Sequence, residues 1–93
     1  MTTDIDRQVQ KRFYEALDNL IERKIIRGIQ TYCRLHNIDK RNLYAQRKRT
    51  DVTIMHFDWL LPMVTEYGIS SYWLLTGIGE MYLPYYQKNT KNA

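Results

Sequence analysis

The residues best suited to chemistry in this chain are the basic and amide side chains between positions 31 and 50. Residues 23–50 hold nine of the fourteen lysines and arginines of the chain and a single acid, Asp39. Lysine, arginine and asparagine hydrogen-bond purine edges in the DNA major groove, and cations neutralise phosphates. Charge segregated in this way favours a polyanion that docks on one face, although a solvated basic surface would give the same run of charge.

Backbone signals divide this stretch into two short helices joined by a tight turn. Asn37 accepts the left-handed conformation that such a turn needs, and Asp39 can cap the next helix by accepting hydrogen bonds from its first amides. That helix is predicted over residues 40–49, with Leu43 and Ile38 pointing inward. A helix, a tight turn and a second helix with a cationic first turn form the arrangement that places a helix in a DNA groove.

Five side chains of the helix over 40–49 are left on or near its outer face, where they are candidates for contact with base edges. They are Lys40, Arg41, Asn42, Tyr44 and Ala45. The far end of this helix suits the phosphate backbone, which positions a protein without being read as sequence. The candidates there are Arg47, Lys48, Arg49 and Thr50.

The sequence before this stretch predicts a long first helix over residues 4–24, capped by Thr3. Its apolar stripe is Ile5, Val9, Phe13, Leu17 and Ile21, widened by Ala16 and Leu20. A break at Gly28 then precedes a second helix over residues 29–36. Cys33 in that helix is interpreted as a packing residue, because no base partner or metal-ligand spacing accompanies it.

The sequence after the basic stretch predicts a fourth helix from a cap at Thr53 to about Tyr67. Pro62 lacks an amide, so we expect a bend or a later start, and Gly68 should close the helix in the left-handed conformation. The expected core face is Phe57, Leu60, Leu61 and Val64.

A fifth helix is predicted over residues 71–76, between a cap at Ser70 and a stop at Gly77. The expected core residues around it are Trp73, Leu74 and Met81. The predicted fold is therefore all-α, a compact five-helix bundle that contains a helix-turn-helix. The domain is expected over residues 1–83, and residues 84–93 are expected to form a short mobile tail.

Composition limits the remaining classes of function. No apolar run approaches the roughly 20 residues of a membrane helix, the N-terminus lacks the features of a secretory signal, and a single cysteine fits a reducing cytoplasm. The chain also lacks paired carboxylates, a phosphate-cradling glycine loop and a metal motif. We therefore expect a cytoplasmic protein that is not an enzyme and uses no metal or cofactor.

Two segments resemble the lambda-repressor-like helix-turn-helix family of the Cro/CI type. The first is YCRLHNIDKRNLYAQRKR and the second is EYGISSYWLLTGIGEMY. The run SYWLLTGIGEMY is similar to the end of the DNA-binding domain in phage CI-like repressors, and the resemblance covers about residues 26–82. Two positions depart from the family: Asn37 replaces the usual turn glycine, and Gln46 stands where an apolar or tryptophan side chain is usual.

The resemblance implies a sequence-specific transcriptional regulator, a repressor of the phage or mobile-element type, which reads the major groove of double-stranded DNA with the helix over 40–49. By similarity, Lys40 and Arg41 would touch base edges, Ala45 could meet a thymine methyl, and Gln30 and Thr31 would contact backbone phosphate. Small members of the family bind pseudo-palindromic operators as homodimers, so a homodimer is expected.

Other functions remain as alternatives to DNA binding. The helix-turn-helix scaffold could serve as a protein-interaction module, such as an antitoxin or adaptor, in which case no salt-sensitive DNA retention is expected. RNA binding is a weaker alternative, since the aromatic stacking motifs of single-strand binders are missing.

Overall fold

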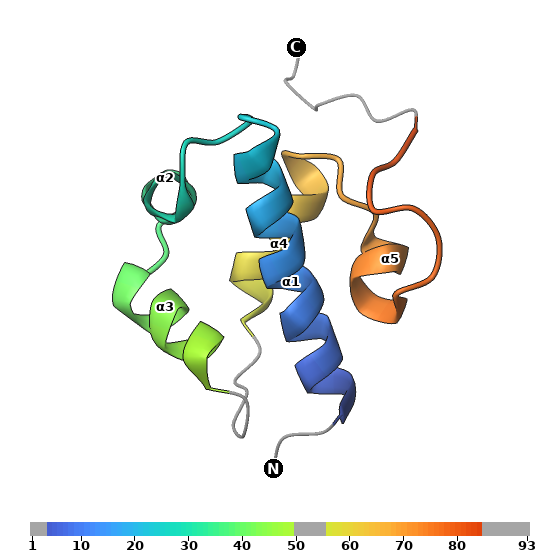
Figure 1. Cartoon of the computed structure of the whole chain (residues 1–93), viewed down its shortest axis with the longest axis horizontal. Coiled ribbons are helices and arrows are strands. Elements are labelled where there is room, and N and C mark those ends of the chain that lie inside the picture. The colour runs from blue at the N-terminus through green and yellow to red at the C-terminus, as the bar shows by residue number, and fades with distance from the viewer. Residues whose placement is uncertain (1–3, 50–55, 85–93) are drawn as a thin grey trace. The chain divides into compact units, whose positions relative to one another are not determined.

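The computed structural model describes residues 4–49 and 56–84, and every regular element in them is an α-helix (Figure 1). The helices are α1 (Asp4–Glu22), α2 (Ile29–Leu35), α3 (Lys40–Lys48), α4 (Phe57–Thr65) and α5 (Ser71–Thr76). For the described residues this confirms the all-α class, the five helices and the long N-terminal helix. None of the described helices is both long and apolar enough to cross a membrane.

The chain is divided into two compact units, each of which has its own helices. The first unit runs from Met1 to Met55 and holds α1, α2 and α3, and the second runs from His56 to Ala93 and holds α4 and α5. The caps expected at Thr3 and Thr53, the phosphate contact expected at Thr50 and the tail expected beyond Pro84 lie outside the described residues.

Helix α1 buries most of the stripe that its periodicity marks. The buried members are Val9, Phe13, Ala16, Leu17 and Leu20. Ile5 was expected in the same stripe but is 68% exposed, and Ile21 is half-buried. The prediction is wrong at Ile5 because periodicity identifies the apolar face of a helix and not how far along its length that face is covered.

The connection from α1 to α2 turns at Lys24. This residue has a φ of 63°, in the left-handed region. The carbonyl of Leu20 accepts the amides of Ile25 at 3.0 Å and Ile26 at 3.4 Å, so the end of the helix is capped by the main chain. Gly28 is the N-cap of α2 in an extended conformation, so the second helix begins directly after this glycine, as predicted.

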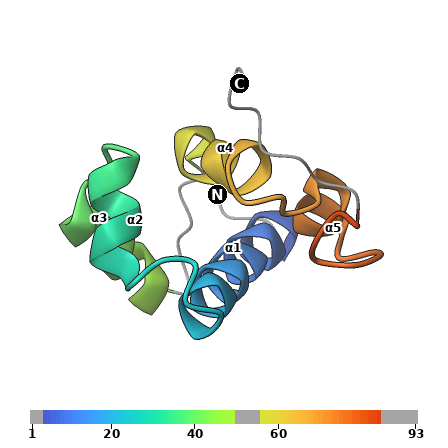
Figure 2. The same cartoon turned by 90° about the horizontal axis from the view of Figure 1, so that it is seen from above.

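The turn between α2 and α3 has the geometry that its residues predict. Asn37 is left-handed with a φ of 58°. The Ile38 amide donates to the Cys33 carbonyl at 2.9 Å, which closes the turn. Asp39 is extended and caps α3, because its side chain accepts a hydrogen bond from the Arg41 amide at 3.0 Å. As a result α2 lies beside α3 in both views (Figures 1 and 2).

The first unit has an aromatic core that joins α1 to α2. The ring of Phe13 meets the ring of Tyr32 edge to face, with centroids 6.0 Å apart, and the ring of Tyr32 lies 4.7 Å from that of His36. Edge-to-face pairs of this kind add to the gain from burying apolar surface. Cys33 and Leu43 are buried as well, so α2 and α3 both contribute to this core.

The second unit buries a different face of α4 from the one expected. Trp59, Leu60 and Met63 are buried, whereas Phe57 is 74% and Leu61 60% exposed. Val64, also expected in the core, is half-buried. The prediction is wrong at Phe57 and Leu61 because this short helix is apolar on almost every side, so two stripes fit a helical period equally well. The helix does start later than Thr53, at Phe57, with Pro62 inside it.

The boundaries of α5 follow the predicted signals. The Ser70 hydroxyl accepts the Trp73 amide at 3.2 Å, and Gly77 is left-handed with a φ of 80°. Gly68, which is predicted to close α4, is left-handed with a φ of 73° and follows the C-cap Glu66 by two residues. Trp73 and Leu74 are buried as expected, and Met81 is half-buried. After Gly77 the chain returns to pair with the α4–α5 connection.

This pairing joins two short segments of the second unit. The Ser70 amide donates to the Met81 carbonyl at 2.8 Å, and the Leu83 amide donates to the Gly68 carbonyl at 2.9 Å. Ile69 and Tyr82 form an isolated antiparallel bridge between them. The fully buried Ile69 side chain therefore has main-chain hydrogen bonds on either side of it.

The conformation of Asn37 gives a test of the turn. Asn37→Val should lower the free energy of unfolding by about 2 kcal/mol, because a β-branched side chain is strained at positive φ. Asn37→Gly, which accepts the same backbone, should stay within about 0.5 kcal/mol of the wild type. Urea unfolding followed by far-ultraviolet circular dichroism measures both. Equal losses for the two variants would show that the left-handed turn does not limit stability.

Candidate nucleic-acid interface

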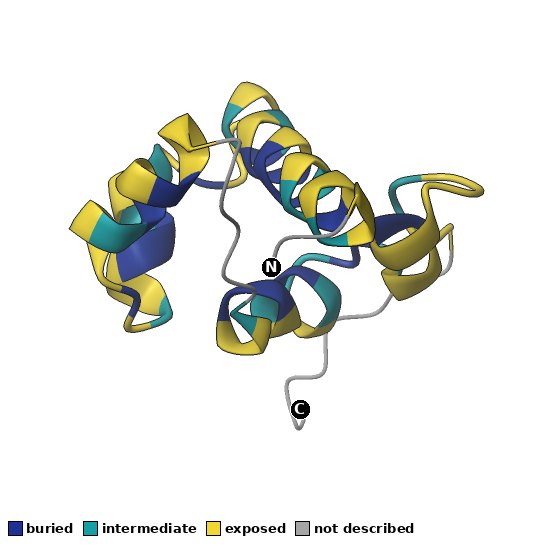
Figure 3. Ribbon diagram, turned by 90° about the horizontal axis from the view of Figure 1, so that it is seen from below, coloured by how far each residue is buried: buried dark blue, intermediate teal, exposed yellow. Residues whose placement is uncertain are grey.

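Helix α3 has one buried side and one exposed side, and this determines which residues face outward. Leu43 and Gln46 are its buried residues. Four of the five predicted base-reading residues are exposed: Lys40, Arg41, Tyr44 and Ala45. Asn42 is half-buried, because it stands four residues before Gln46 and so on the same side of the helix. Figure 3 shows the buried and exposed sides of the helices in the first unit. The structure therefore leaves four of these five side chains accessible to a ligand.

The burial of Gln46 sets the register of the second half of α3. Its side chain is only 6% exposed, although it is polar. The Gln46 side chain therefore lies on the buried side of α3, together with Leu43. Because Leu43 and Gln46 are three residues apart on a helix, Tyr44, Ala45 and Lys48 must point elsewhere.

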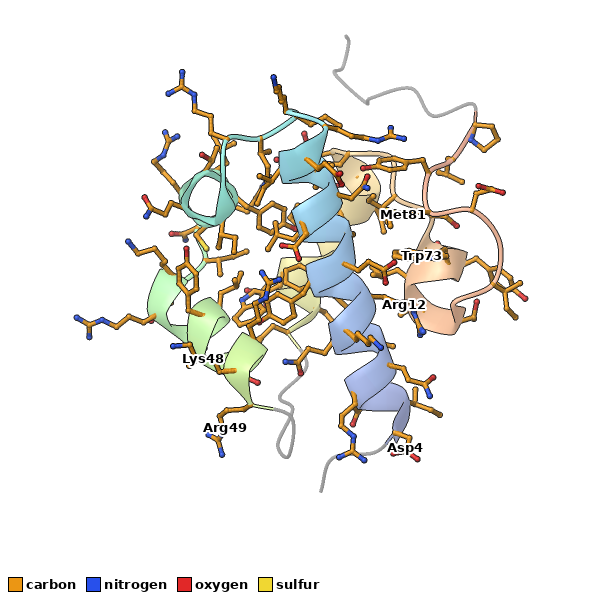
Figure 4. The ribbon with its side chains drawn as sticks, in the orientation of Figure 1. Asp4, Arg12, Lys48, Arg49, Trp73 and Met81 are labelled. Carbon is orange, nitrogen blue, oxygen red and sulfur yellow. The ribbon has the colours of Figure 1, made fainter. Side chains whose placement is uncertain are left out.

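The predicted phosphate-contacting residues at the end of α3 fall into two groups. Lys48 and Arg49 are exposed, and their side chains extend from the C-terminal end of the helix (Figure 4). Arg47 is held by Asp18 of α1, with Nη1 donating to Oδ1 at 3.0 Å and Nη2 to Oδ2 at 2.5 Å. These hydrogen bonds raise the pKa of Arg47, so the guanidinium is both charged and oriented.

The N-terminal end of α2 carries the other two predicted phosphate contacts. Gln30 is exposed and Thr31 half-buried, in the first turn of the helix. The Thr31 amide donates to the Gly28 carbonyl at 3.1 Å, and Gly28 gives no side-chain cap. The structure thus places Gln30 and Thr31 on α2, and places Lys40 and Arg41 at the start of α3.

One edge of α1 holds α3 in place, and the sequence patterns did not identify it. Gln10 Nε2 donates to the Gln46 carbonyl at 2.7 Å, Tyr14 Oη donates to the Leu43 carbonyl at 2.6 Å, and Asp18 pairs with Arg47. The three residues of α1 are spaced by four, so they form one line along the helix. That spacing is present in the sequence, but it lies outside the apolar stripe from which the helix is predicted.

Tyr14 is the buried member of this line. Burial raises the pKa of its hydroxyl, so the group stays protonated and can donate. The guanidinium carbon of Arg47 lies 5.3 Å from the centroid of the Tyr14 ring, within the range of a cation–π contact. Tyr14 therefore contacts α3 through both its hydroxyl and its ring.

A shallow hollow of about 550 Å³ lies between α1 and the end of α3. Cationic side chains from both helices line it, together with the acids Glu15 and Asp18. The cations are Arg7, Lys11, Arg47 and Arg49. Arg7 is paired with Asp4 at 2.7 Å, and Arg47 is paired with Asp18. These two ion pairs reduce the net positive charge of the hollow.

Cys33 has the surroundings of a packing residue. It is buried, and this burial raises the pKa of its thiol, while nearby Lys40 acts in the opposite direction. A thiol with a raised pKa is a weak nucleophile near neutral pH. Within residues 4–49 and 56–84, no group of three or more histidine, cysteine or acidic side chains is arranged to hold a metal ion.

Comparison with known proteins gives no match: no family model, no curated protein and no solved structure is similar to this chain. The chemistry of the interface therefore follows from its own residues. The candidate interface consists of exposed Lys40 and Arg41 at the start of a short helix that is hydrogen-bonded to α1.

The hydrogen bond from Tyr14 can be tested by removing one oxygen. Tyr14→Phe should lower the free energy of unfolding by about 0.5–1.5 kcal/mol, because the ring stays and only the bond to the Leu43 carbonyl is lost. The same change at exposed Tyr44 should stay within about 0.5 kcal/mol. Urea unfolding by circular dichroism compares the two variants, and equal stabilities would mean that the bond contributes nothing to holding α3.

Proposed function

We propose that this protein binds double-stranded DNA sequence-specifically, with α3 in the major groove, and regulates transcription. The observation that carries the proposal is the start of α3, where exposed Lys40 and Arg41 are followed by half-buried Asn42 on a helix with one buried side. These three side-chain types match the acceptors and donors on purine edges.

The position of Lys40 and Arg41 on α3 supports the proposal that they bind a ligand and do not serve only for solubility. A cation at a helix N-terminus opposes the helix dipole and typically costs about 0.3–1 kcal/mol. The first turn of α3 has no acid, and the cap Asp39 offsets part of this cost. Lys48 lies in the last turn, where the dipole favours a cation with or without a ligand. Lys40 and Arg41 are therefore stronger evidence for an anionic ligand than Lys48.

The distribution of charge supports the same surface. Nine lysines and arginines lie in residues 23–49, whereas residues 56–84 contain none. A polyanion would accordingly be attracted to the first unit and repelled by the acids of the second. The resemblance of the sequence to helix-turn-helix repressors agrees with this assignment.

The mechanism that follows is occupancy of an operator. Phosphate neutralisation by Lys48 and Arg49 supplies affinity, and contacts from the start of α3 supply discrimination. Ala45 presents a methyl group that suits a thymine methyl, and Tyr44 lies beside it. Bound at a promoter, the protein would act in the cytoplasm as a repressor of the phage or mobile-element type.

The role of Arg47 is better explained as positioning. Its guanidinium is engaged by Asp18 and by the Tyr14 ring, so a phosphate would have to compete with two protein partners. Exposed ion pairs of this kind contribute roughly 0.2–1 kcal/mol, which a DNA phosphate could outweigh. We therefore assign Arg47 first to the attachment of α3 and second to DNA.

Selection from a random pool tests the function directly. Double-stranded DNA bound by the full-length protein should be enriched for a two-fold symmetric motif, since one helix reads only a few base pairs and two copies are needed for a useful site. An enriched motif without symmetry would contradict the expected homodimer. A pool that shows no enrichment and no salt-sensitive retention would contradict DNA binding itself.

The two ends of α3 should respond differently to truncation. Arg41→Ala should weaken operator binding by about 1–3 kcal/mol and relax the preference at one base pair, with little effect on random DNA. Lys48→Ala is the matched control: it should weaken binding to both DNAs alike and reduce the slope of log affinity against log salt by about one. Fluorescence anisotropy over a range of salt measures both effects.

The comparison is decisive for Arg41. Equal losses on operator and random DNA for Arg41→Ala would show that this side chain contacts phosphate and does not read a base. The base contacts of α3 would then have to come from Lys40, Asn42 or Tyr44.

A further inference from the structure

The second unit has an apolar groove that DNA binding does not use. A hollow of about 390 Å³ lies between α4 and α5. Leu60 and Leu74 line it from buried positions. Phe57, Leu61 and Leu75 line it too, and more than half of each of these side chains is exposed. Large apolar groups are therefore exposed together around one concave site.

The exposed apolar side chains are clustered around the groove. Single apolar residues on a surface are ordinary, but a contiguous set around a hollow is typical of a binding surface. Phe57 and Leu61 are four residues apart on α4, so they stand on one side of that helix. A groove between two helices with such walls has the form that receives an amphipathic helix through anchors at i, i+3, i+4 and i+7.

Charge indicates what kind of helix would fit. Asp58 lines the groove beside Phe57 and Leu61. Residues 56–84 contain two further acids, Glu66 and Glu80, and no lysine or arginine. The electrostatic complement of this unit is therefore a cationic partner.

We propose that the α4–α5 groove binds an amphipathic helix from a partner protein, with an apolar stripe in the groove and lysine or arginine along its edges. A second copy of this unit is a poorer occupant, because a two-fold pair would place identical acidic surfaces together without a cation from either copy. The groove is built from residues of the second unit and α3 belongs to the first, so the inference does not rest on the proposed DNA binding.

A synthetic helical peptide can serve as the probe. It carries leucines at i, i+3, i+4 and i+7 and lysines elsewhere, with no aromatic residue. Both tryptophans of the chain, Trp59 and Trp73, lie in α4 and α5, so tryptophan fluorescence of the full-length protein reports on this unit alone. We expect saturable binding of this peptide and none of a peptide with serines in place of the leucines.

Substitutions in the groove test whether the peptide binds there. Leu61→Asn should weaken binding by roughly ten-fold or more, because the peptide loses a buried apolar contact. Leu75→Asn, on the opposite wall, should act in the same direction. Ile5→Asn is the matched control, since Ile5 is similarly exposed but lies on α1, and it should leave the affinity unchanged. Circular dichroism of each variant serves to check that the helices are retained.

The charge argument has its own test. A peptide with glutamates in place of the lysines should bind more weakly than the lysine peptide. Asp58→Asn should weaken the lysine peptide by roughly two- to five-fold at low salt, as expected for an exposed ion pair. Equal binding of the two peptides would overturn the cationic partner.

Two other results would overturn the proposal as a whole. One is lysine-peptide binding that is absent, or that survives both Leu61→Asn and Leu75→Asn. The other is self-association of the wild-type protein in light scattering that Leu61→Asn abolishes, because a second copy would then occupy the groove.

Discussion

The attachment of α3 to one edge of α1 is the interaction on which the candidate interface depends. Gln10 and Tyr14 donate to main-chain carbonyls of α3, at Gln46 and Leu43, and Asp18 binds the Arg47 side chain. Hydrogen bonds to the main chain hold a helix without restricting its side chains. The exposed side chains of α3 are therefore free to contact a ligand, while hydrogen bonds to its carbonyls and the buried Leu43 side chain hold the helix against α1.

The start of α3 shows how local stability and the proposed function are balanced. Asp39 satisfies the Arg41 amide and places a negative charge at the positive end of the helix dipole. This offsets the cost of Lys40 and Arg41 in the same turn. At the other end, the last turn carries Arg47 and Lys48, which the dipole favours. The two ends of a nine-residue helix thus differ in what their charges cost.

The two units present different chemistry to potential partners. The first exposes cations and amides on α3, suited to an anionic polymer with a regular array of acceptors. The second exposes apolar side chains beside carboxylates and has no basic residue in residues 56–84. Under the two proposals, the chain would bind a DNA site through its first unit and a protein helix through its second. Substitutions in one surface would then leave binding to the other surface unchanged.

Local signals in the sequence were sufficient to predict the helices and the exposure of Lys40 and Arg41 at the start of α3. Asn37, Asp39, Ser70, Gly68 and Gly77 all have the backbone or capping roles expected of them, because turns and caps depend on a few neighbouring atoms. The tertiary structure alone decided which side of α4 is buried, that Ile5 is exposed, and that Arg47 pairs with Asp18. These outcomes depend on residues distant in sequence. Periodicity shows that a helix has apolar and polar sides, but which side is covered, and which charge finds a partner, is determined only when the helices pack.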